Sequence, residues 1–165
     1  MRFFVGAVAL LFFIDSVFAA YDADGVPLGA SEQQVKKRYP SARCKALEWA
    51  SQAADRRCDD GKALFAGMET RITFYLKKDA VQAFDVRFDA KFTERMASTL
   101  KGRYGKPSAE EREKPDRPDA PPREVYKLLW EGQGERALFT ALSDKRRASL
   151  LVSRGNFEEE IYRVR

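Results

Sequence analysis

Apolar and polar side chains alternate along several stretches of this 165-residue chain. Successive side chains of a strand point to opposite faces of a sheet, so this alternation indicates strands with one face on a core. Short turns containing Gly, Asp or Lys separate most of the stretches, which is typical of antiparallel hairpins. The predicted strands are Thr70–Leu76, Val81–Phe88, Val125–Glu131, Arg136–Leu142, Arg147–Ser153 and Glu159–Val164, and Cys44–Trp49 is a further candidate beside Arg56–Asp60.

Two other stretches follow the period of a helix. Ser31 and Gln34 have the Ser-x-x-Gln spacing of a capping box, so we expect a short helix to begin there and to end at Pro40. A second helix is expected where an apolar side chain recurs at every fourth residue, and Gly105 and Pro107 are expected to end it. This apolar stripe consists of Phe92, Met96, Leu100 and Tyr104.

The end of the first helix has a counterpart in the second. The residues VKKRY at Val35–Tyr39 recur as LKGRY at Leu100–Tyr104, and strand patterns follow each copy. The sequence therefore predicts an α+β protein with two helix-plus-antiparallel-sheet units in tandem, each helix packed on one sheet face. We expect the first unit over 20–89 and the second over 90–165, with a mobile, charged, Pro-rich loop at 108–124.

The first 19 residues have the layout of a secretory signal peptide. Arg2 precedes an apolar run over 3–14, and Val17 and Ala19 stand at the −3 and −1 positions of a cleavage site. As a helix, this run spans about 18 Å, whereas a transmembrane anchor needs to cross about 30 Å. We therefore expect an exported protein, periplasmic or secreted after cleavage near Ala19, with no transmembrane segment in the mature chain.

Cys44 and Cys58 are the only cysteines. In an exported chain, an even number of cysteines predicts a disulfide, which here would close a loop of about 15 residues. The alternative is a redox-active pair. Such pairs usually have Cys-x-x-Cys spacing, which this sequence lacks.

The composition excludes several kinds of chemistry. The chain has no histidine, so it has no histidine-based triad, imidazole base or histidine metal site. It also has no Gly-rich phosphate loop, and we expect neither a cofactor nor a metal. Asp22, Asp24 and Gly25 resemble the centre of a calcium loop, but Ala20 and Ser31 stand where that loop needs acidic ligands.

The net charge of +5 comes from short basic groups with acidic residues between them. No nucleic-acid recognition motif accompanies them, so we expect no nucleic-acid partner. Attraction to an anionic envelope surface through net charge alone is expected to be weak.

Two short motifs resemble a known family. Residues 28–35, LGASEQQV, are similar to the Gly-x-Ser/Thr-x-x-x-Val opening of the BamE (SmpA/OmlA) family, and Tyr104–Pro107 is similar to its Gly-x-Pro helix end. The tandem layout also resembles that of the β-lactamase inhibitor protein family. These resemblances imply small exported α+β modules that bind proteins without catalysis. The chain differs from BamE in that no lipobox cysteine follows its apolar run.

The predicted strands also indicate a binding face. If the apolar rows pack on the helices, the opposite rows mix apolar groups with cations and hydroxyls, as protein-binding patches do. The candidate binding residues are Arg71, Thr73, Tyr75, Lys127, Leu129, Ser149 and Leu151. We therefore predict a non-catalytic protein that binds another envelope or secreted protein. The alternatives are a hydrolase with Asp/Glu or Ser/Lys groups, or a binder of anionic envelope polymers or lipids.

Overall fold

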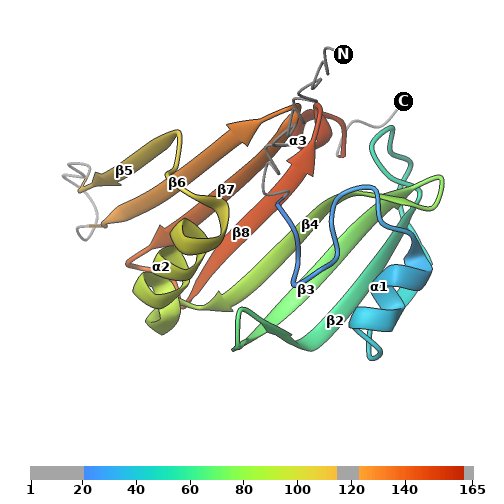
Figure 1. The fold of residues 1–165 in the computed structure, drawn as a ribbon, viewed down its shortest axis with the longest axis horizontal. Helices are drawn as coiled ribbons and strands as arrows, with labels where there is room; N and C mark the ends of the chain where they lie inside the picture. The colour runs from blue at the N-terminus through green and yellow to red at the C-terminus, as the bar shows by residue number, and fades with distance from the viewer. Residues whose placement is uncertain (1–20, 115–122, 162–165) are drawn as a thin grey trace, which may run out of the picture.

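The computed structural model describes residues 21–114 and 123–161. They form an eight-stranded antiparallel sheet with the order β1-β2-β3-β4-β8-β7-β6-β5 (Figure 1). The strands are β1 (Arg43–Ala46), β2 (Arg56–Phe65), β3 (Met68–Lys77), β4 (Ala80–Asp89), β5 (Ala109–Glu113), β6 (Val125–Gly132), β7 (Glu135–Leu142) and β8 (Arg147–Arg154). The helices are α1 (Glu32–Arg38), the 3₁₀ turn η1 (Ala90–Phe92), α2 (Thr93–Tyr104) and α3 (Phe157–Glu160).

The prediction of two helix-plus-sheet units in tandem is wrong, because the protein is mostly β and has one large sheet. Strand β4 pairs with β8, in a register that runs from Ala83 opposite Ser153 to Asp89 opposite Arg147. Two separate sheets would each leave a row of unpaired backbone donors and acceptors at this edge. Pairing β4 with β8 satisfies both rows and joins the two halves of the chain.

Helices α1 and α2 cover the same face of the sheet, with α1 over the β1–β4 half and α2 over the β5–β8 half (Figure 1). Val35 of α1 and Leu100 of α2 are fully buried, in one core with strand side chains such as Phe74 and Leu128. Burying a side chain of this size contributes about 1.5–3 kcal/mol. The opposite face of the sheet, here called the open face, carries α3 near one end.

The segment 21–30 runs across the covered face between the two helices (Figure 1). The last residue of each repeat copy holds it there. The Tyr39 hydroxyl donates to the Ala23 carbonyl at 3.2 Å, and the Tyr104 hydroxyl donates to the Asp22 carbonyl at 2.9 Å. Burial is the main cause that raises the pKa of both hydroxyls, so both stay protonated donors.

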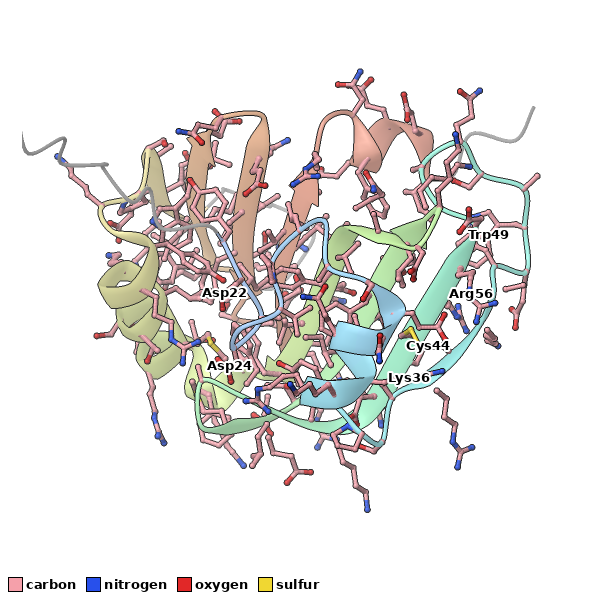
Figure 2. All side chains as sticks on the ribbon, turned by 45° about the vertical axis from the view of Figure 1, so that its right-hand side comes forward. Asp22, Asp24, Lys36, Cys44, Trp49 and Arg56 are labelled. Carbon is pink, nitrogen blue, oxygen red and sulfur yellow. A yellow bond between two sulfur atoms is a disulfide. The ribbon has the colours of Figure 1, made fainter. Side chains whose placement is uncertain are left out.

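The Asp24 carboxylate ties this segment to three other parts of the fold. One oxygen accepts the Ala66 N–H at 3.0 Å, in the turn between β2 and β3, and pairs with Arg38 of α1 at 3.3 Å. The other oxygen pairs with Arg103 of α2. Figure 2 shows Asp24 between the two helices. Both oxygens of Asp24, one of the residues that resemble a calcium loop, are thus engaged by guanidinium groups.

Two stretches differ from the sequence-based expectation. Residues 109–113 form the edge strand β5, although 108–124 was expected to be a loop, and 115–122 lie outside the described residues. Residues 159–161 belong to α3 and the turn after it, so the predicted strand Glu159–Val164 is wrong there.

The predicted signal peptide, 1–19, also lies outside the described residues. In the part of the chain that is described, no helix has the length and apolarity that a membrane crossing requires.

Candidate binding face

A row of side chains crosses the open face from strand to strand. Leu129 of β6 lies opposite Leu138 of β7, which in turn lies opposite Leu151 of β8. All three side chains are half-buried, and together they are called the leucine row. Neither α1 nor α2 covers them, because the neighbouring side chains along each strand face those helices. The row is therefore an apolar strip on the open face.

The same row becomes polar where it continues across β4, β3 and β2. Leu151 lies opposite Asp85, Asp85 opposite Thr73, and Thr73 opposite Asp59. The Thr73 hydroxyl donates to Asp59 at 2.9 Å. Nε of Arg87 donates to Asp85 at 2.8 Å. Burial raises the pKa of Asp85, and the nearby Arg87 charge partly opposes the shift.

The structure places all seven predicted binding residues on the open face. Their strand neighbours are buried on the covered face, as Ile72 and Phe74 are beside Thr73. The seven lie on β3 (Arg71, Thr73, Tyr75), β6 (Lys127, Leu129) and β8 (Ser149, Leu151). Because β4 and β8 pair, these residues share one continuous surface rather than two separate ones.

Two of the seven lie at the part of the open face that other segments cover. Tyr75 and Leu151 pack against a small second core around Phe157 and Ile161. The Tyr75 and Phe157 rings are 5.3 Å apart. These two residues therefore have a structural role, and the accessible binding positions lie farther along the sheet.

The loop that follows β1 fastens α3 to this end of the face. Nε1 of Trp49 donates to the Ile161 carbonyl at 2.8 Å, and the Ser51 hydroxyl donates to the Glu160 carbonyl at 3.3 Å. Figure 2 shows Trp49 in this loop. Trp49 lies at the end of the candidate strand Cys44–Trp49, and its position in the sequence indicates no role. Its partner lies 112 residues away in sequence, and no local pattern could indicate it.

Sequence reasoning also missed three residues of the open face. Leu138 alternates with the buried Ala137 and Phe139, so the strand pattern itself could have identified it. Asp85 and Arg87 alternate in the same way along β4. Only the β4–β8 pairing shows that these two residues adjoin the leucine row, and that pairing is not local in sequence.

Cys44 and Cys58 face each other across β1 and β2, with their sulfur atoms at disulfide distance (Figure 2). The Glu32 carboxylate lies within 4.8 Å of both sulfurs, which is the spacing of a metal site. However, sulfurs joined in a disulfide are not the thiolates that bind metals. The Glu32 oxygens are also engaged, with Arg56 at 2.8 Å and Lys36 at 2.7 Å. This cluster is therefore structural.

Comparisons of the chain with protein-family models, with curated proteins and with solved structures find no match. The resemblance to the BamE and β-lactamase inhibitor protein families thus stays a prediction. Any function has to be argued from the open face itself.

Proposed function

We propose that this protein is a non-catalytic exported protein that binds another envelope or secreted protein through the open face. The observation that carries the proposal is the leucine row, in which Leu129 and Leu138 are half-buried side chains aligned across β6 and β7, beyond the part of the open face where Leu151 packs against the core around Phe157. Covering them with a partner would remove apolar surface from water, at about 25 cal/mol per Å². The expected partner is a protein that presents apolar side chains to this strip.

The surroundings of the leucine row support a protein partner. Val125 and Leu142 lie opposite each other and are also half-buried, so they form a second apolar pair on β6 and β7. Lys127 and Thr140, also paired across these strands, lie between this pair and the leucine row. Protein interfaces combine apolar and polar groups in this way.

The alternative of a hydrolase would draw on Asp59 and Asp85. They lie two strands apart, which corresponds to roughly 9–10 Å between their backbones. Each carboxylate is already engaged, Asp59 with the Thr73 hydroxyl and Asp85 with Arg87. These contacts supply a structural reason for both acids, and they support binding over catalysis.

The experiment is site-specific photo-cross-linking in the native compartment. A photo-reactive phenylalanine analogue replaces Leu129 on the open face or, as a matched control, Gln33, which is exposed on α1. We expect one adduct of defined mass from position 129 and none from position 33. Mass spectrometry of the adduct identifies the partner.

A second substitution tests whether the leucine row makes the contact. Leu138→Glu should lower the yield of the adduct from position 129 at least tenfold, since it places a charge in the apolar strip. Lys127→Glu, at an exposed position on the same face, gives the same test if Leu138→Glu fails to fold. Equal adducts from positions 129 and 33, or an adduct that neither substitution weakens, would contradict the proposal.

A further inference from the structure

A strongly basic groove lies at one end of the open face, away from α3. Its volume is about 710 Å³, and strands β3, β4 and β8 contribute to it. It is lined by six cationic side chains and two carboxylates, a net charge of +4. The cations are Lys62, Arg71, Arg87, Lys91, Arg146 and Arg147, and the acids are Glu69 and Asp89.

Two of the arginines oppose each other within the sheet. Arg71 of β3 and Arg87 of β4 are a directly paired cross-strand couple. Like charges in this position destabilise a sheet. Arg87 has a counter-charge, because Asp85 accepts from it at 2.8 Å. Arg71 has no carboxylate within 4 Å among residues 21–114 and 123–161.

The backbone beside Arg71 leaves room for a ligand. Strand β2 has a register shift between Asp60 and Ala63, and this bulge places Gly61 and Lys62 at the groove. A Cβ atom built on Gly61 would meet no atom within 4 Å. A bound group can therefore approach the backbone here as well as the guanidinium of Arg71.

We propose that this groove binds an anion that carries two or more phosphate groups. A guanidinium presents a planar set of N–H donors that matches two phosphate oxygens. Four of the six cations have no carboxylate partner among the described residues, so a single carboxylate could not balance them. A bound oligophosphate would also relieve the repulsion between Arg71 and Arg87. The site does not use the leucine row, so it stands independently of the proposed function.

Isothermal titration calorimetry with sodium tripolyphosphate tests the proposal on the purified exported protein. We expect binding in 50 mM NaCl that weakens in 300 mM NaCl, because salt screens exposed charges. Arg71→Ala should weaken binding at least tenfold without lowering the melting temperature, since it also removes the like-charge pair. A merely structural arginine would not show this combination. The matched control is Lys37→Ala on α1, which should bind as the parent does.

Sedimentation with vesicles distinguishes two sources of such phosphates, namely lipid headgroups and a free oligophosphate. Vesicles of phosphatidylglycerol and phosphatidylcholine present phosphate headgroups with net negative charge, whereas pure phosphatidylcholine vesicles do not. Binding to the anionic vesicles that tripolyphosphate displaces identifies lipid headgroups as the ligand, and binding of tripolyphosphate alone identifies a free oligophosphate. The proposal is overturned if tripolyphosphate does not bind, if Arg71→Ala binds it like the parent, or if Lys37→Ala weakens it equally.

Discussion

Replacing Asp24 tests whether one carboxylate holds the two helices to the N-terminal segment. The side chain is only 12% exposed, and it contacts Ala66, Arg38 and Arg103. Its own backbone has φ of +48°, a left-handed conformation that Asp and Asn adopt more readily than Ala. Asp24→Ala removes the hydrogen bond, the charge and this conformational tolerance. Asp24→Asn removes only the charge.

The contacts of Asp24 determine how much unfolding free energy each variant should lose. Leaving the Ala66 N–H without its acceptor costs about 1–3 kcal/mol. The two arginine pairs are half-exposed, so each contributes only about 0.2–1 kcal/mol. Placing Ala in the left-handed region adds about 1 kcal/mol. Asp24→Ala should therefore lose about 4 kcal/mol of unfolding free energy, and Asp24→Asn about 1 kcal/mol.

Urea denaturation of the disulfide-intact protein measures both variants, with the slope m as a check that the unfolded states are comparable. Asp22→Asn is the matched control. The Asp22 carboxylate accepts one local bond, from the Gly25 N–H at 2.8 Å, and Asn can still accept it. We expect this control within about 0.5 kcal/mol of the parent. Equal losses for Asp24→Asn and Asp24→Ala, or no loss in Asp24→Ala, would refute the reasoning.

Two further predictions concern the β1–β2 edge. Replacing both Cys44 and Cys58 by Ala should lower the unfolding free energy by about 2–4 kcal/mol in urea titrations, because the bridge closes a loop in the unfolded chain. Finding two titratable thiols in protein taken from its native compartment and denatured without reductant would contradict the bridge. Hydrogen bonds from Arg56 and then Lys36 lower the pKa of Glu32 from its ordinary 4.5, so its stabilisation is present above that pH and is lost as the pH falls through the folded-state pKa. Glu32→Gln should therefore lose less stability than the parent on acidification below about pH 4.5, and parallel stability curves for the two proteins would count against this.

The sequence predicted most individual elements, because local patterns decide them. Alternation along Thr70–Leu76 follows the buried and open faces of β3. The spacing of Ser31 and Gln34 indicated the capping box that the structure has. Strand β5 was missed because its residues, AEERE, are all exposed and have no apolar alternation. The ion pair of Glu110 with Lys101 helps hold this edge, and sequence patterns do not reveal such a contact.

The sequence predicted which side chains share the open face, but not that the two halves of the sheet join into one surface. Alternation is the same for a strand at an edge and a strand in the centre, so β4 gave no sign that it pairs with β8. Without that pairing, Arg87 could not be placed between Arg71 and Ser149. The cover over Tyr75 was also missed, because it comes from α3, where a strand was expected.

The strand order also has a bearing on how the chain completes its fold. Both series of strands run inward, from the edges β1 and β5 to β4 and β8 at the centre. During synthesis, β4 therefore exposes a ten-residue edge until β8, the last of the described strands in chain order, is available. An open edge of this kind pairs readily with another chain. A chain cut before Arg147 should thus aggregate, and two intact chains that exchange their second halves should form a domain-swapped dimer through the same central pairing.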